Sequence, residues 1–176
     1  MRQSYTFEDR HWVYFGYEVD WAPDRCKTCC DLLYRNLKPP PQAINCWKLE
    51  IFFSNCTDVQ AVKDYLLEEG LKDHTLHGKW LKEEMEIPRD KLTSIPASAH
   101  PDPDVKKDGA ILIYTQSIAE RDERKAKILA DLKARGLYRK DAISSRRGCV
   151  NFDEIIGPWT EWYDLERDYE GPKPQW

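Results

Sequence analysis

A basic segment in the last third of the chain combines side chains that could hold a phosphate group. It contains guanidinium groups, an ammonium group, hydroxyls and a final glycine: Arg139, Lys140, Ser144, Ser145, Arg146, Arg147 and Gly148. Guanidinium groups form paired, charge-assisted hydrogen bonds with phosphate oxygens, and a glycine lets the backbone approach an anion. We therefore expect a loop that binds a phosphate-bearing ligand, through Arg139, Lys140, Ser145, Arg146 and Arg147.

The distribution of charge allows a second interpretation of this basic loop. Lys and Arg are in excess over 121–147, whereas Asp and Glu are in excess over 150–170. Either the two segments pair with each other in the folded chain or the basic one binds a ligand, and the sequence leaves both open. The net charge of −4 argues against nonspecific binding of nucleic acid by the whole surface.

Familiar catalytic patterns are absent from the sequence. It has no Gly-rich phosphate loop, no nucleophile elbow, no His-Glu-x-x-His and no paired-Asp metal pattern. Isolated ionisable residues remain near the ends of predicted strands: Lys48, Glu50, His74, His77, Lys79, Tyr114, Arg146 and Arg147. Each of these, taken singly, is typical of a solvated surface, so the sequence leaves open whether the protein is an enzyme.

The cysteines suggest a metal site and also a simpler interpretation. Cys26, Cys29 and Cys30 have half the spacing of a zinc ribbon, and further ligands could come from Cys46, Cys56, His74, His77 and Cys149. A second tight pair is missing, however, and Cys26 and Cys30 fall on the apolar stripe of a predicted helix. Because reduced cysteine packs as a small hydrophobic residue, we expect no metal and no cofactor, with structural zinc as the alternative.

The clearest folding signal lies between residues 109 and 137. A short, β-branched apolar run over 111–114 predicts a buried strand. Ser117 stands three residues before Glu120, which is the capping-box spacing that begins a helix. Gly136 predicts a left-handed stop after an apolar stripe that includes Leu129 and Leu132, and we expect both leucines to be buried.

An earlier segment, 47–71, follows the same plan. A strand is followed by Thr57, which stands three residues before Gln60 in a second capping-box pattern. The next apolar stripe includes Leu66, which we expect to be buried, and Gly70 predicts the end of the helix. The chain is therefore predicted to place two β-α units on a common sheet.

These signals together predict an α+β fold in which a mostly antiparallel sheet carries about three helices on one face. The expected strands cover about 11–17, 46–53, 76–81, 110–115, 148–152 and 158–163, and the expected helices cover about 24–37, 57–69 and 117–135. The length of 176 residues predicts a single domain over 1–176. Prolines between 88 and 107 predict a mobile loop, and 171–176 is expected to form a short tail.

Composition indicates a soluble protein. Hydrophobic residues make up 41% and charged residues 33%, and no apolar run approaches the roughly 20 residues that a membrane span needs. The first twelve residues lack the apolar stretch of a signal peptide. We therefore expect a cytoplasmic protein without a membrane partner, and the sequence does not define its oligomeric state.

The order of three motifs resembles the phosphothreonine lyase family. The motifs are Trp47-Lys48-Leu49-Glu50-Ile51, Gly78-Lys79-Trp80, and Ile111-Leu112-Ile113-Tyr114 followed by a helix that closes at Gly136. The order is equally similar to that of an uncharacterised eukaryotic domain related to this family, whose fold is similar to that of the cap-binding translation initiation factor. The resemblance covers about residues 45–150.

This resemblance implies an elimination reaction with roles for three residues. Lys79 would remove the proton α to the phosphothreonine carbonyl, and Tyr114 would help to hold the phosphate. In the family a His on one strand serves as the acid, but the corresponding strand here, Trp47-Lys48-Leu49-Glu50, contains no His. Gln116 stands where a phosphate-binding Lys is expected. The resemblance then implies that His77 or His74 supplies the acid, so Lys79, His77 and Tyr114 are the catalytic candidates.

Three hypotheses follow from the sequence. The first is a binding domain that recognises the phosphate of a nucleotide, an RNA end or a phosphoprotein. The second is a phosphothreonine-lyase-like enzyme that eliminates phosphate. The third is a non-catalytic protein-interaction domain. Clustered Lys, His, Tyr and Arg side chains in one dry pocket would favour the enzyme, whereas basic residues spread around an exposed aromatic ring would favour binding. The most informative observation is whether Lys79, Tyr114 and Arg146 or Arg147 converge.

Overall fold

The computed structural model describes residues 6–8, 12–16, 35, 46–82, 85–86 and 107–148. Its strands are β1 (Thr6–Glu8), β2 (Trp12–Phe15), β3 (Trp47–Phe52), β4 (His77–Leu81), β5 (Met85–Glu86), β6 (Lys107–Asp108), β7 (Ala110–Thr115) and β8 (Ser144–Arg147). Its helices are the short 3-10 helix η2 (Phe53–Asn55) and the α-helices α3 (Val59–Lys72) and α4 (Ile118–Ala134).

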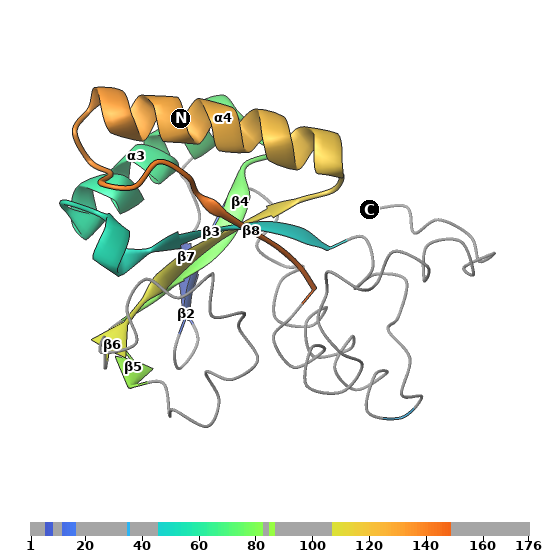
Figure 1. Cartoon of the computed structure of the whole chain (residues 1–176). Coiled ribbons are helices and arrows are strands. Elements are labelled where there is room, and N and C mark those ends of the chain that lie inside the picture. The colour runs from blue at the N-terminus through green and yellow to red at the C-terminus, as the bar shows by residue number, and fades with distance from the viewer. Residues whose placement is uncertain are drawn as a thin grey trace.

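Six of the strands form one sheet in the order β1-β2-β4-β7-β3-β8, and every neighbouring pair is antiparallel. Helices α3 and α4 both lie on the same face of this sheet (Figure 1). Strands β5 and β6 form a separate two-stranded pair. The predicted α+β class with an antiparallel sheet is therefore confirmed.

The described part of the chain contains two long helices rather than the three that the sequence predicted. The third expected helix, 24–37, lies outside the described residues except for Arg35, which is helical. The expected strand 158–163, the tail 171–176 and all but the last residue of the loop 88–107 also lie outside them. No helix in the described ranges is long and apolar enough to cross a membrane.

The two predicted β-α units are adjacent in the sheet. Strand β3 precedes η2 and α3, β7 precedes α4, and the two strands pair over their full length, from Trp47 opposite Thr115 to Phe52 opposite Ala110. Because side chains alternate along a strand, every second residue points to the helices. Those residues make the centre of the core, in which Leu49, Ile51, Ile111 and Ile113 are fully buried.

Only some of the apolar residues predicted for the helix stripes are fully buried against this core. Leu66 of α3 and Leu132 of α4 are fully buried, as predicted. Leu129 packs against the core but is only partly buried, so the expectation that it is buried holds only in part. Ile128, one position earlier, takes the buried place instead.

The ends of α4 match the sequence pattern. The Ser117 hydroxyl accepts a hydrogen bond from the Glu120 N–H, while the Glu120 carboxylate accepts one from the N–H of Gln116, one residue earlier than in the usual capping box. Gly136 has a φ of +67°, and the N–H groups of Gly136 and Leu137 bond to the carbonyls of Lys133 and Leu132. This is the predicted left-handed stop.

The ends of α3 differ from the prediction. The N-cap is Asp58, whose carboxylate accepts from the Ala61 N–H, whereas the Thr57 hydroxyl donates to the carbonyl of Gly136. Gly70 does not end the helix but lies inside it, and the helix continues to Lys72. Asp58 is as good an N-cap residue as Thr57, so the sequence pattern alone does not separate these two starts of the helix.

The basic segment also differs from the prediction. Residues 144–147 form strand β8 and not a loop, and they pair with residues 47–50 of β3. The expected strand 148–152 overlaps the described residues only at Gly148, which directly follows β8. Pairing with the edge of β3 favours a strand here although Ser-Ser-Arg-Arg lacks the apolar pattern of one.

Candidate functional site

Register places four chemically active side chains in a row on the sheet face that points away from the helices. His77 of β4 lies opposite Tyr114 of β7, Tyr114 lies opposite Lys48 of β3, and Lys48 lies opposite Arg146 of β8. Directly opposite residues in antiparallel strands share one face of a sheet. Leu49 and Ile113 are buried beneath the helices, so the residues next to them in sequence point the other way. We call these four residues the sheet-face row.

The cations of the sheet-face row are buried. The exposed fraction is 3% for Lys48 and 5% for Arg146. The Lys48 Nζ atom donates to the carbonyl of Gly148 at 2.8 Å and lies 5.2 Å from the centre of the Tyr114 ring. Ammonium and guanidinium groups rarely lose so much contact with water in a folded protein, because desolvation disfavours the charge. Buried cations in folded proteins are held by hydrogen bonds or charged partners, and the Gly148 carbonyl is one such partner of Lys48.

The ring of His77 has a defined place at the other end of the row. Its Nδ1 atom lies 2.8 Å from the carbonyl oxygen of Thr75, and its ring stacks on Tyr114 with centroids 6.0 Å apart and planes 7° apart. A carbonyl can only accept a hydrogen bond, so Nδ1 carries the proton and Nε2 is the basic nitrogen of the neutral ring.

Gly16, which directly follows β2, leaves room for the backbone and Cβ atom of His77. A Cβ atom at Gly16 would lie 2.5 Å from the Cβ atom of His77.

Lys79 shares the face with the sheet-face row but its ammonium group lies elsewhere. Its register partners are Tyr14 of β2 and Leu112 of β7. The Lys79 Nζ atom is 4.0 Å from the centre of the Trp12 ring and 5.6 Å from that of Tyr14. Both rings belong to β2, on the opposite side of β4 from Tyr114. The three predicted catalytic residues therefore share one face, while the Lys79 ammonium group lies on its β2 side.

The five predicted phosphate-binding residues do not come together. Arg146 belongs to the sheet-face row, whereas Ser145 and Arg147 point to the helix side of β8. Arg139 and Lys140 are exposed in the connection between α4 and β8. The alternation of side chains along β8 explains this division, because neighbouring residues of a strand point to opposite faces.

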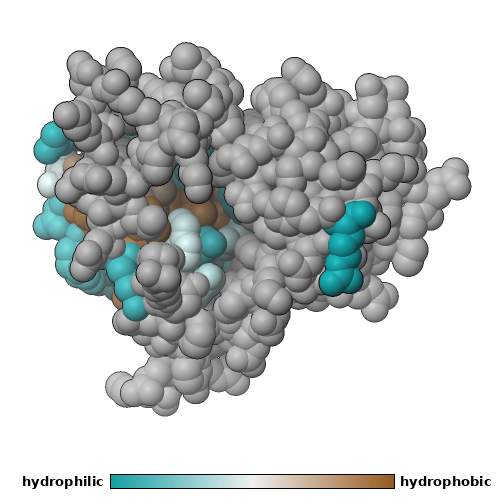
Figure 2. Space-filling model, turned by 90° about the horizontal axis from the view of Figure 1, so that it is seen from below, coloured by the Kyte–Doolittle hydropathy of each residue, from teal (hydrophilic) through white to brown (hydrophobic). Residues whose placement is uncertain are grey.

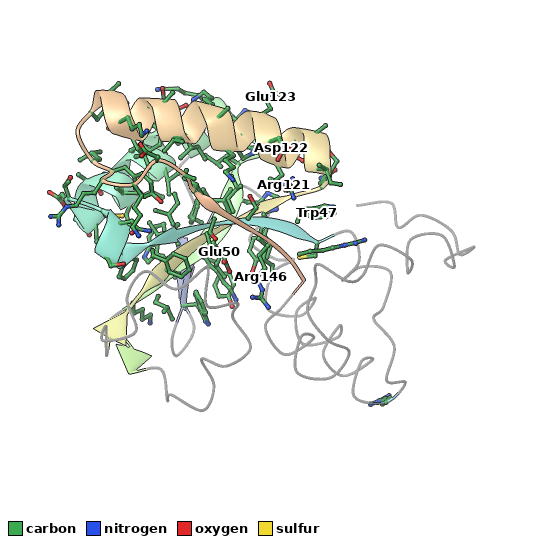
Figure 3. The ribbon with its side chains drawn as sticks, in the orientation of Figure 1. Trp47, Glu50, Arg121, Asp122, Glu123 and Arg146 are labelled. Carbon is green, nitrogen blue, oxygen red and sulfur yellow. The ribbon has the colours of Figure 1, made fainter. Side chains whose placement is uncertain are left out.

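The helix side of β8 is occupied by contacts that join α4 to the sheet. The guanidinium carbons of Arg121 and Arg147 lie 4.9 Å and 4.8 Å from the centre of the Trp47 ring. The Lys125 ammonium group donates to the Ser145 hydroxyl at 3.2 Å. Figure 3 shows Arg121 between α4 and the sheet and Arg146 on the opposite side of the sheet. Arg147 and Ser145 thus contribute to packing on the helix side.

Sequence reasoning named Lys48 only as an isolated ionisable residue. Strand β3 reads Trp-Lys-Leu-Glu-Ile-Phe, in which Lys48 and Glu50 alternate with the buried Leu49 and Ile51. That alternation was visible in the sequence and places Lys48 and Glu50 on the face away from the helices. The pairing of Lys48 with Tyr114 and Arg146 was not visible, because register between distant strands is set by the whole fold.

The face seen from the side away from the helices is chemically mixed. Figure 2 shows apolar, intermediate and hydrophilic atoms of the described residues meeting in one part of this view. Within the described ranges no group of three or more His, Cys, Asp or Glu side chains could hold a metal ion. The Cys56 thiol donates to the Phe52 carbonyl at 3.4 Å, and the proposed zinc residues Cys26, Cys29 and Cys30 lie outside those ranges.

No family model, curated protein or solved structure matches this chain. The resemblance to the phosphothreonine lyase family therefore stays a prediction. The function proposed below follows from the residues of the sheet face and their register.

Proposed function

We propose that the sheet face binds a phosphate-bearing ligand, such as a nucleotide, an RNA end or a phosphoprotein, with Lys48 and Arg146 holding the phosphate. The observation that carries this proposal is the register of the sheet-face row. It sets a buried ammonium and a buried guanidinium group at directly opposite positions of neighbouring strands, next to a phenol and an imidazole.

Electrostatics favours an anion at this pair. Lys48 and Arg146 lie at directly opposite positions on one face of the sheet, so an anion that reaches both side chains is attracted to each of them. Guanidinium is a fork that pairs with two phosphate oxygens, and ammonium adds a compact point charge. Lys48 and Arg146 therefore suit one phosphate group between them.

The length of the row indicates a ligand larger than inorganic phosphate. Strands lie about 4.8 Å apart, so four neighbouring strands span about 14 Å from Arg146 to His77. A phosphate at the Lys48–Arg146 end would leave the rest of the ligand against Tyr114 and His77. Tyr114 offers a hydroxyl and an aromatic ring, and His77 offers a second ring that stacks with it.

Binding should be measured with three probes and their unphosphorylated counterparts. The probes are a phosphothreonine peptide, a nucleoside triphosphate and a short 5′-phosphorylated RNA, titrated into the full chain by calorimetry. We expect at least one phosphorylated probe to bind and its counterpart to bind far more weakly. If none of the three binds, the proposal is wrong.

Arg146 and Arg147 form a matched pair for the mutational test, because they are adjacent arginines on opposite faces of β8 and both are buried. Arg146→Lys removes the fork that holds two oxygens and should weaken binding about 10-fold to 100-fold, which corresponds to roughly 1.5–3 kcal/mol. Arg147→Lys should leave the affinity nearly unchanged. Equal losses in two folded variants would contradict a site on the sheet face.

An enzyme that eliminates phosphate is the second candidate, and the shared face of Lys79, His77 and Tyr114 supports it. In that reaction a neutral amine takes the α proton, the β carbon–oxygen bond breaks, and phosphate leaves with its electron pair. The aromatic rings of Trp12 and Tyr14 around the Lys79 Nζ atom favour the charged amine, which is the wrong form for a base. Turnover of the phosphothreonine peptide that disappears in Lys79→Ala would replace the binding proposal with this one.

A further inference from the structure

The turn between α3 and β4 carries His77 into the sheet-face row and is held by its own side chains. The Asp73 carboxylate accepts hydrogen bonds from the Thr75 N–H at 2.9 Å and from the Thr75 hydroxyl at 2.6 Å. The N–H of Leu76 also bonds to the Asp73 carbonyl at 3.1 Å. Two residues after Thr75 the chain reaches His77, the first residue of β4.

Arg124 of α4 fixes this turn from the side. One guanidinium nitrogen donates to the Asp73 carboxylate at 2.9 Å, and the other donates to the Thr75 hydroxyl at 2.8 Å and to the Glu120 carboxylate at 2.9 Å. Burial opposes ionisation of Asp73, but hydrogen bonds from Thr75 and the nearby Arg124 outweigh it and keep the pKa of Asp73 below its usual value. The Arg124 side chain is 10% exposed and that of Asp73 is 46% exposed, so this contact is partly shielded from water.

The carbonyl of Thr75 connects this network to the sheet face. It accepts the Nδ1–H of His77 at 2.8 Å, which selects the tautomer with Nε2 as the basic nitrogen. The position of that carbonyl depends on the turn, because the Thr75 N–H and hydroxyl are both bound to Asp73 and the hydroxyl also to Arg124.

We propose that Arg124 is a positioning residue for His77: by holding the Asp73–Thr75 turn, it keeps the Thr75 carbonyl on Nδ1 and so fixes Nε2 as the nitrogen that serves the ligand. The role of Nε2 in ligand binding rests on the proposed function, in which His77 belongs to the binding face. The role of Arg124 in fixing the tautomer concerns the protein without a ligand. Contacts across more than 45 residues of sequence thus set the protonation pattern of one ring.

The test is nitrogen NMR of the full chain with labelled histidine, recorded without ligand in the pH range where His77 is neutral. The chain has four histidines, and the signals of His77 are identified by their loss in His77→Gln. In the wild type we expect Nδ1 to show the shift of a protonated nitrogen and Nε2 that of an unprotonated one. In Arg124→Gln the two shifts should move toward each other, as in a mixture of tautomers.

Lys127→Gln is the matched control. Lys127 also joins α4 to α3, but its ammonium group pairs with Glu69 and Asp131 rather than with the Asp73–Thr75 turn, so Lys127→Gln should leave the ring of His77 unchanged. Arg124→Lys keeps a charge for Asp73 without the fork and should give intermediate shifts, which keeps the test open if Arg124→Gln is poorly folded. Wild-type shifts in folded Arg124→Gln, or equal changes in Lys127→Gln, would overturn the positioning role.

Affinity for the phosphorylated probe supplies the second readout. Loss of the fixed tautomer should weaken binding about 5-fold in Arg124→Gln, as expected for one misplaced hydrogen bond, and should leave Lys127→Gln unaffected. If no phosphorylated probe binds the wild type, the proposed function fails while the NMR result still decides the role of Arg124. If the tautomer shifts but affinity does not, Nε2 does not serve the ligand.

Discussion

Lys48 and Arg146 occupy directly opposite positions of β3 and β8, and both side chains leave the sheet on the face away from α3 and α4. Trp47 and Arg147, the adjacent pair, point to the helix side, where the guanidinium carbon lies 4.8 Å from the centre of the indole ring. The two arginines of β8 therefore lie on opposite faces of the sheet: Arg147 packs against Trp47, and Arg146 belongs to the proposed site. That separation makes mutations on the two faces distinguishable.

Replacing Lys48 with methionine should remove binding while keeping the fold. Methionine has a similar length and no charge, so Lys48→Met avoids both a cavity and the desolvation of an ammonium group. We expect the free energy of unfolding to stay within about 1.5 kcal/mol of the wild type and the affinity for the phosphorylated probe to fall at least about 10-fold. Urea unfolding followed by circular dichroism, together with calorimetry, gives both quantities. Retained affinity would remove Lys48 from the site.

The two leucines of α4 should differ in their contribution to stability. Leu132 is fully buried, so Leu132→Ala should lower the free energy of unfolding by about 2–5 kcal/mol. Leu129 is only partly buried, and Leu129→Ala should cost about 1 kcal/mol, since less apolar surface returns to water. Urea unfolding of both variants makes the comparison. A larger loss in Leu129→Ala would show that the stripe predicted from the sequence is the true core face.

The start of α3 provides a test of the corrected cap. Asp58→Ala removes the acceptor for the Ala61 N–H and should lower the free energy of unfolding by about 1 kcal/mol. The Gln60 side chain donates to the Asp64 carboxylate on the helix surface, so Gln60→Ala should change the free energy of unfolding by less than about 0.5 kcal/mol. Thermal and urea unfolding are suitable measurements. The reverse order would restore the capping box that begins at Thr57.

The elements predicted correctly share one property, which is that their signals are local. Ser117 and Gly136 specify the ends of α4 through contacts within a few residues, and the apolar run over 111–114 is long enough to predict β7. Strand β8 has no such signal. Its four polar residues become a strand because the edge of β3 offers unpaired backbone groups, and no local pattern contains that information.

The candidate site was only partly predictable for the same reason. His77 and Tyr114 lie near the ends of their strands, as predicted, whereas Lys79 is the middle residue of β4. Both strands were predicted within one or two residues. The division of Arg139, Lys140, Ser145, Arg146 and Arg147 followed from the strand that replaced the loop. Lys48 became a site residue only through its partners on β7 and β8, which lie 66 and 98 residues away in sequence.

Alkaline pH should destabilise the fold through a buried tyrosine. Burial raises the pKa of Tyr138 to about 12, and its hydroxyl donates to the Ala142 carbonyl at 3.1 Å. The unfolded chain loses this proton near pH 10, so the stabilisation is complete below about pH 10 and is lost as pH rises toward 12. The loss should be on the order of 2 kcal/mol, measured by urea unfolding between pH 9 and about 11.5.

Tyr138→Phe is the control for this pH dependence. The variant lacks the titrating hydroxyl, so its stability should decline less steeply above pH 10 than that of the wild type. Part of the decline should remain, because burial and the hydrogen bond to Asp131 also raise the pKa of Tyr65. An unchanged slope in Tyr138→Phe would assign the whole alkaline loss to other groups.

Gly16 should be far less replaceable than Gly70, and the pair tests the structure around His77. Gly16 has a φ of +118°, a region that side chains with a Cβ atom rarely adopt, and an added Cβ would lie 2.5 Å from the Cβ of His77. Gly16→Ala should therefore lower the free energy of unfolding by more than about 2 kcal/mol and shift the ring signals of His77. At Gly70, inside α3, an added Cβ meets only the Leu76 carbonyl at 3.8 Å, so Gly70→Ala should stabilise by about 0.5–1 kcal/mol. Urea unfolding gives the free energy of unfolding of both variants, and histidine NMR gives the ring shifts of His77. A tolerated Gly16→Ala with unchanged His77 signals would contradict the close approach of Gly16 to His77.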